Sequence, residues 1–310
     1  MVIKTFIIFF LNLMTINQFT NGQYIKKKLA QSFFQIYQNQ YIQGITPFQK
    51  YINSSPSQLI KESEPYLTDT LPAVRSFAYE LINASAKKSN DKNVRQTAVF
   101  DLIIASKDKG AGIPGNTGKY LQQFSKDDFN SKSRDSIAAI IKRGNGFLES
   151  LILISGYLQL SNLTPGLHAV LLNKSQNDKT KWAAHLALAR LDDLQEINYC
   201  INLVKNRPLN DAVVYNMIPG LIYTHQKIIY DYLITILNSN EKNCLSPNPD
   251  NGQQIICGYR MMEFLAPVIV GFPLQTIDGV NQIKTDNYDQ ALKTARSWFV
   301  EHKDNYIIKK

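Results

Sequence analysis

The chain has 310 residues and a formal net charge of +9, and this length allows one large domain or two small ones with a sizeable core. Its three cysteines and four dispersed histidines show no zinc-binding spacing, and the G-x-S-x-G motif of serine hydrolases is absent. The positive charge is compatible with an anionic partner, but the lysines are scattered among Asn, Gln, Ile and Tyr, which is typical of a solvated surface.

Residues 1–22 have the features of a secretory signal peptide. Lys4 precedes a short, mostly apolar run over 5–16, and small or polar residues at 20–22 suit signal-peptidase cleavage. The run is too short to span a bilayer of about 30 Å comfortably, so a retained membrane anchor is the less favoured alternative. Lys4 is the only charged residue in the segment, so a mature chain from Gln23 carries +8. We expect a secreted or periplasmic protein with no stable membrane span after cleavage.

Helical periodicity covers almost all of the mature chain. Aromatic residues between Ala30 and Ile42 predict an N-terminal capping helix, and prolines then mark a linker, so 23–56 is assigned to cap and linker. The remaining residues, 57–310, are assigned to one helical domain. Its predicted helices cover 57–66, 70–86, 91–105, 118–124, 128–142, 147–160, 165–172, 178–191, 193–206, 211–223, 225–237, 256–270 and 287–302. No run with strand alternation interrupts them, and the predicted fold class is all-α.

A short phrase recurs along this helical pattern. Asp69 leads into Val74-Arg75, Asp91 leads into Val94-Arg95, and weaker copies stand at Ser133-Arg134 and Thr180-Lys181. Each copy places polar, turn-forming residues before an apolar helical face.

The phrase resembles the second-helix signature of HEAT-type, armadillo-like helical repeats. The resemblance implies a right-handed α-solenoid of stacked antiparallel helix pairs, whose concave face would be an extended binding surface. The intervals between the four basic positions are 20, 39 and 47 residues. The repeats are therefore expected to be irregular, and either two adjacent helices both carry the phrase or one copy is coincidental.

The cysteines fall into a pair and a single residue. Cys244 and Cys257 bracket a turn-rich segment, and export would permit a bond, so a disulfide is predicted between them. Closing a loop of this length contributes about 3 kcal/mol. Cys200 lies in an apolar helical pattern and is interpreted as a buried thiol.

The glycine-rich segment 110–119 formally contains G-x-G-x-x-G. A dinucleotide site requires a strand before this motif, whereas a helix is predicted here, and a phosphate-binding loop would require glycine in place of Ile113. The segment is therefore interpreted as a flexible loop between repeats.

Other possible site residues have structural interpretations. His185 is expected to be a satisfied or partly exposed histidine rather than a base, and the pairs Asp127-Asp128 and Asp192-Asp193 are expected to cap helices. Four asparagines, which matter only in a eukaryotic source, begin N-x-[ST] sequons: Asn53, Asn83, Asn162 and Asn173. Aromatic and basic residues that could line a groove, although packing is their default role, are Tyr157, Trp182, Tyr199, Tyr215, Tyr223, Tyr230, Tyr232, Tyr259, Arg143, Lys205 and Arg260.

The sequence assigns no catalytic, cofactor-binding or metal-binding residue and leaves the binding residues unknown. The expected function is that of an exported, non-catalytic scaffold that binds a protein or peptide. The alternatives are a HEAT-like enzyme resembling a DNA glycosylase, which export argues against, and a binder of anionic glycan or a membrane surface.

Overall fold

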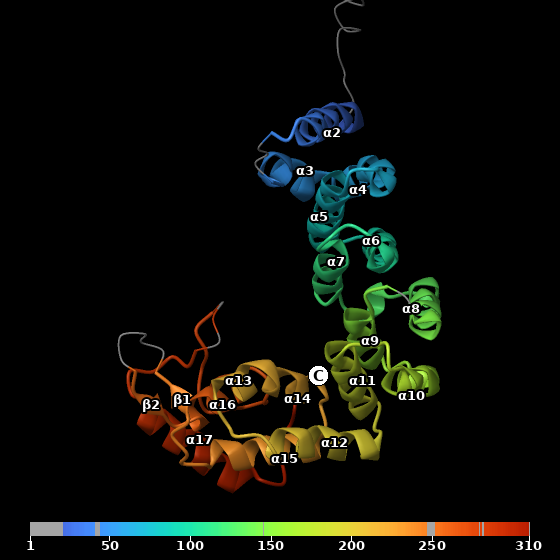
Figure 1. Cartoon of the computed structure of the whole chain (residues 1–310). Coiled ribbons are helices and arrows are strands. Elements are labelled where there is room, and N and C mark those ends of the chain that lie inside the picture. Colours follow the sequence, from blue (N-terminus) through green and yellow to red (C-terminus); the bar gives the residue numbers. More distant parts are fainter. Residues whose placement is uncertain are drawn as a thin grey trace, which may run out of the picture. The chain divides into compact units, whose positions relative to one another are not determined.

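Helices form nearly all the regular structure in a computed structural model that describes residues 21–40, 44–144, 146–246, 252–278, 280 and 282–309 (Figure 1). The predicted all-α class is confirmed. The predicted signal peptide falls outside the described residues except for its last two positions. No helix in the described part of the chain combines the length and apolarity needed to cross a bilayer.

The chain divides into two units, Met1–Ile154 and Ser155–Lys310. The first contains α2 (Asn21–Tyr37), α3 (Gln49–Ser54), α4 (Pro56–Ser63), α5 (Pro72–Lys88), α6 (Lys92–Ile104), α7 (Ile113–Leu121), α8 (Ser131–Arg143) and the start of α9 (Leu148–Tyr157). Short 3-10 helices in this unit are η1 (Thr46–Phe48), η2 (Glu64–Thr68), η3 (Ala105–Lys107) and η4 (Lys126–Asp128).

The helix predicted at the N-terminal end exists, but it is displaced toward the N-terminus. α2 begins at Asn21 and ends at Tyr37, whereas the aromatic pattern placed the helix over 30–42. The pattern was misleading because the buried face also includes Ile25 and Leu29, which pack with Phe33 in one apolar cluster. Residues spaced four apart lie on one helix face, so the helix must include the earlier turn.

In the first unit, successive helices alternate between two layers. α4, α6 and α8 lie on one side, and α5 and α7 lie on the other (Figure 1). α5 contacts α4, α6 and α7, and α6 also contacts α8. Each helix therefore buries one face against the other layer and its edges against neighbours in its own layer.

The interpretation of 110–119 as a flexible loop is wrong beyond Gly112. Gly112 has a φ of 81°, which favours glycine, and α7 begins at the next residue with Pro114 in its first turn. Gly118 is buried within this helix, and a Cβ there would lie 2.2 Å from Ser150 Oγ of α9. This glycine therefore permits close helix packing rather than a turn.

The second unit contains the rest of α9 and the following elements: η5 (Ser161–Leu163), α10 (Thr164–Leu172), α11 (Asp178–Arg190), α12 (Leu194–Lys205), α13 (Asp211–Asn216), α14 (Ile218–Tyr223), α15 (Lys227–Leu237), β1 (Cys244–Leu245), β2 (Gln254–Ile255), α16 (Gly258–Leu265) and α17 (Tyr288–His302). α11 packs against α10, α12 and α14, while α16 packs against α15 and α17.

Prolines shorten two helices relative to the sequence prediction. The helix predicted over 211–223 is divided at Met217, because Pro219 has no N–H to bond the preceding turn. α16 ends at Leu265 rather than 270, just before Pro267. The antiparallel strands β1 and β2 were not predicted, because two-residue strands show no alternating pattern.

Candidate functional site

Arg75 links its own helix to the loop after α6. Its Nη2 and Nε donate to the two carboxylate oxygens of Asp108 at 2.6 and 2.7 Å, and its Nη1 donates to the Asp69 carbonyl at 2.7 Å. Both partners of the ion pair are largely buried. The Arg75 guanidinium holds the pKa of Asp108 below its usual range. The arginine of the repeated phrase is therefore a structural link between neighbouring helices.

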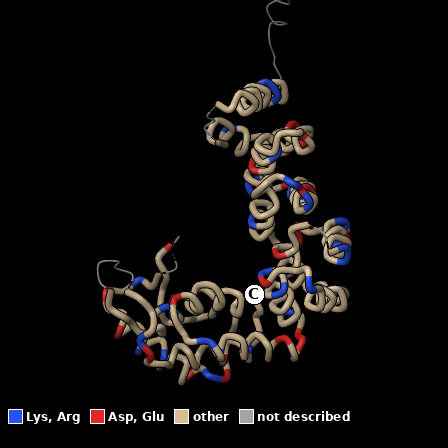
Figure 2. Tube along the Cα trace, in the orientation of Figure 1, with Lys and Arg blue, Asp and Glu red and all other residues tan. Residues whose placement is uncertain are grey.

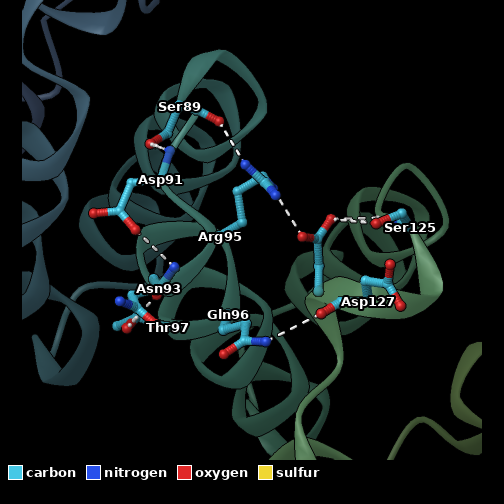
Figure 3. A network of polar contacts seen from close by, with 9 residues as sticks. Ser89, Asp91, Asn93, Arg95, Gln96, Thr97, Ser125 and Asp127 are labelled. Atoms are coloured by element: carbon cyan, nitrogen blue, oxygen red, sulfur yellow. Dashed lines mark hydrogen bonds and ion pairs between the residues drawn. The ribbon is translucent and has the colours of Figure 1, made fainter.

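Arg95 makes the equivalent link one helix later (Figure 3). Its Nε donates to Asp128 Oδ1 at 2.7 Å, and its Nη1 donates to the Ser89 carbonyl at 2.9 Å. Asp128 in turn accepts hydrogen bonds from the backbone N–H and the hydroxyl of Ser125, which completes a capping box. Asp91 caps α6 as predicted, because its Oδ1 accepts from Asn93 N at 2.8 Å.

The two links share their sequence spacing. Arg75 and Arg95 each pair with an aspartate 33 positions later, and each donates to a carbonyl six positions earlier. Arg134 keeps the local part, since its Nε donates to the Phe129 carbonyl five positions earlier. Neither of the first two copies is therefore coincidental: the adjacent helices α5 and α6 both carry the phrase, which explains the interval of 20 residues between them.

The carboxylate pair at 192–193 serves two purposes. Asp193 caps α12 as predicted, accepting from the backbone of Gln195 and Glu196, and its second oxygen lies 2.9 Å from His168 Nε2. The capping prediction is wrong for Asp192, which has a φ of 67° and accepts from the Gln226 side chain. Its backbone N–H donates instead to the Ala189 carbonyl in the last turn of α11.

The second histidine–carboxylate pair joins α11 to α12. His185 Nδ1 is hydrogen-bonded to the buried Glu196, and its ring stacks on Tyr199 at 3.8 Å between centroids. Cys200 is fully buried on the same helix, and burial raises its pKa to about 12. The thiol therefore stays protonated at neutral pH, as the sequence interpretation required. No group of three or more metal-ligating side chains occurs among the described residues.

The aromatic and basic residues considered as the lining of a groove are divided among separate clusters. Buried Arg190 lies over the rings of Tyr223 and Tyr157 at 4.6 and 5.6 Å, a packing role. Lys205 and Tyr232 line a hollow of about 360 Å³ that also includes Arg207. A third cluster, around Arg260, lies beside the disulfide. Arg143 belongs to α8 in the other unit and Trp182 to α11.

The predicted disulfide between Cys244 and Cys257 is present and closes the β1–β2 hairpin. In register, Cys244 faces Ile255 and Leu245 faces Gln254. Both cysteines are buried against Val214 of α13. The bond therefore fixes the base of the hairpin to the helical framework.

Two charged side chains hold the backbone of Leu245. Asp211 Oδ2 accepts from its N–H at 2.7 Å, and Arg260 Nη2 donates to its carbonyl at 3.3 Å. Asp211 Oδ1 and Arg260 Nε are buried and have no hydrogen-bond partner among the described residues. The Leu245 side chain itself is 56% exposed. An apolar side chain is thus presented to solvent from a backbone that is fixed on both sides.

Buried polar contacts support this arrangement from α16 and α17. Arg260 Nη1 lies 3.4 Å from Glu263 Oε2, and Tyr288 donates to Glu263 Oε1 at 2.9 Å. Burial raises the pKa of Glu263, although Tyr288 and Arg260 oppose the shift. Burial and the bond to Glu263 raise the pKa of Tyr288 to about 12. Tyr215, half exposed, lies with its ring centroid 5.9 Å from the Arg260 guanidinium.

We call Leu245, Tyr215 and Arg260 the hairpin patch, because the Arg260 guanidinium contacts both the Leu245 carbonyl and the Tyr215 ring. The sequence singled out Tyr215, Arg260 and the disulfide separately, but Leu245 and Asp211 were missed as parts of one site. Tyrosine is enriched among the residues that dominate protein–protein interfaces, and side chains on a rigid frame lose little conformational entropy on binding. No nucleophile paired with a base is present in the patch.

Charge is not concentrated at this site. Figure 2 shows Lys and Arg interspersed with Asp and Glu in both units, with Lys and Arg residues on α8. This distribution agrees with the interpretation of most lysines as solvated surface residues.

No family model, no curated protein and no solved structure matches this chain. Together, the fold and the site define an all-helical chain with a disulfide-closed hairpin near its C-terminal end.

Proposed function

We propose that this protein is an exported, non-catalytic helical-repeat scaffold that binds a protein or peptide partner through the hairpin patch. The observation that carries the proposal is the exposed Leu245 side chain on a backbone held by the disulfide, Asp211 and Arg260. Burying an exposed leucine side chain in an interface stabilises a complex by about 2 kcal/mol.

A HEAT-like, right-handed α-solenoid is the proposed repeat architecture. It is supported by the repeated linkage of Arg75 to Asp108 and of Arg95 to Asp128, and by the alternation of helices between two layers in the first unit. Repeat proteins gain stability mainly from such contacts between neighbours.

Export is supported by the Cys244–Cys257 bond and by the signal-like residues 1–22. Disulfides persist in oxidising compartments and are rare in the cytosol. Secretion or a periplasmic location therefore belongs to the proposal.

The test uses the disulfide-bonded mature protein as bait. Partners are captured by cross-linking from the culture medium or the cell-envelope fraction of its own cells. Leu245→Asp is expected to weaken capture more than tenfold, because loss of about 2 kcal/mol exceeds the 1.4 kcal/mol of a tenfold change. Tyr215→Ala is expected to act in the same direction. Leu194→Asp is the matched control, because Leu194 is also exposed and opens α12, where an acidic residue is tolerated.

Equal capture by wild type and Leu245→Asp would remove the hairpin patch as the binding site. Turnover of a substrate by the purified protein would contradict the non-catalytic part and favour the enzyme alternative. Release of a base from DNA would support the alternative that the protein resembles a DNA glycosylase.

A second candidate function is the binding of an anionic group. It rests on the hollow lined by Lys205 and Arg207, whose two positive charges outnumber the one carboxylate of Glu241 in the same lining. Binding of heparin-like glycan that declines with salt and is lost in Lys205→Glu would favour this function. The same variant is expected to leave protein capture unchanged.

A further inference from the structure

The exposed side of α10 carries several apolar residues next to the partly exposed His168, which pairs with Asp193. Pro165, Ala169 and Leu172 follow one another at helical spacing on this face, and Leu172 is 83% exposed. The exposed Leu172 side chain remains in water unless another group covers it, and covering it would remove apolar area from water.

Asparagine sequons stand at both ends of this face. Asn162 precedes the helix and is exposed, and Asn173 directly follows Leu172 and is also exposed. Asn162 lies in η5, directly before α10, and Asn173 is the C-cap residue of α10, so the two asparagines stand at opposite ends of the helix. A group attached to either one can lie over it.

The Asn173 sequon already has the local geometry of an Asx turn. Asn173 Oδ1 accepts hydrogen bonds from the backbone N–H and the hydroxyl of Ser175 at 2.9 and 2.8 Å. The Ser175 hydroxyl, which completes the sequon, thus donates a hydrogen bond to the side-chain amide of Asn173. The residue lies outside the helix, in extended backbone, so the chain can present the amide without unfolding a helix.

The sequon at Asn83 provides an internal contrast. Asn83 lies within α5 and is only 7% exposed, and the Ser85 side chain is fully buried. A bulky glycan at this position could not fit in the folded unit. The structure therefore separates the buried Asn83 from Asn53, Asn162 and Asn173, which are all exposed, whereas the sequence pattern alone does not.

We propose that Asn162 and Asn173 carry N-linked glycans that cover the apolar face of α10, and that Asn83 carries none. The proposal rests on the export part of the proposed function. The donor is a lipid-pyrophosphate-linked oligosaccharide. The Asn Nδ2 forms a bond to the sugar C1, the C1–O bond to pyrophosphate breaks with its electron pair going to the leaving group, and the amide proton is released.

The first test is peptide mass spectrometry of the protein secreted by its own cells, with and without enzymatic deglycosylation, which converts an occupied asparagine to aspartate. Conversion is expected at Asn162 and Asn173 and not at Asn83. Secreted, disulfide-bonded protein that is unmodified at either of the first two positions overturns the proposal. Conversion at Asn83 overturns it as well.

A parallel arm replaces residues 1–22 with a secretion signal of known activity in a glycosylating host. If residues 1–22 do not direct secretion but the protein with the replaced signal is glycosylated, export by the native sequence is refuted and the glycosylation sites are supported. If the protein is secreted in both arms but carries no glycan, export is supported and the glycosylation sites are refuted.

The covering role is tested with the double variant Asn162→Gln, Asn173→Gln. Loss of both glycans is expected to increase self-association and the binding of an apolar dye several-fold, and an added Leu172→Asp change should reverse both effects. Thermal unfolding of each variant checks that the fold is retained. A folded double variant that stays monodisperse and binds no more dye than the glycosylated protein refutes the covering role.

Discussion

Asp101 on α6 carries a half-buried carboxylate whose Oδ2 has no hydrogen-bond partner among the described residues. Burial, with a smaller contribution from Glu64, raises the pKa of Asp101 to about 7, while Lys132 opposes the shift. The perturbation that we choose is Asp101→Asn, which keeps the side-chain shape and removes the charge.

The sign follows from proton binding. Between about pH 4 and 7 the folded state holds the Asp101 proton and the unfolded state does not, so stability falls as pH rises through this range. A shift from about 3.9 to about 7 sets a ceiling of about 4 kcal/mol, and solvent access reduces the expected effect to about 1–3 kcal/mol. Asp101→Asn should therefore be more stable than wild type at pH 8, with the difference vanishing near pH 4.

Urea unfolding of both proteins between pH 4 and 8 measures this difference. Asp135→Asn, which removes an exposed carboxylate from α8, controls for the change in net charge. A stability difference between Asp101→Asn and wild type that is the same at every pH would refute the reasoning.

Three further predictions concern stability. Arg75→Ala is expected to cost about 3 kcal/mol and Arg95→Ala less, because the second side chain is more exposed; equal losses in urea unfolding would contradict this order. Cys244→Ser should lose about 3 kcal/mol under oxidising conditions and nothing under reducing ones, and full thermal stability of the oxidised variant would argue against the loop-closure account. Gly118→Ala should destabilise by about 1–3 kcal/mol and Gly115→Ala should not, since only Gly118 has a close neighbour. A larger loss of stability in Gly115→Ala would contradict the close packing of α7 and support a loop in this segment.

The sequence predicted those features that depend on local chemistry. Helical periodicity identified most helices, and the Asp91 and Asp193 caps followed from residues placed just before an apolar pattern. The disulfide followed from two cysteines around a turn-rich insert. Features that depend on tertiary contact were missed. The glycines of α7 carry the signature of a loop, and only the nearby Ser150 shows why a helix needs one of them there.

The links of Arg75 and Arg95 show a signal that could have been used. Both arginines point to an aspartate 33 residues later, and in each case that aspartate lies in or before a short turn. A fixed interval between opposite charges is detectable in a sequence. The hairpin patch has no such signal, because Asp211 and Arg260 meet at Leu245 only through the packing of α13 against the disulfide.

The 33-residue interval also affects how the first unit is synthesised. As the chain emerges from the N-terminus, Arg75 has no carboxylate partner until Asp108 appears, and by then Arg95 is waiting for Asp128. Each ion pair can thus form before the partner of the next arginine has been synthesised. This order favours folding of the first unit in steps of little more than one helix and its loop. A nascent chain that stalls between two links would leave one arginine unpaired, and we expect such intermediates to be the species that quality-control proteases cut first.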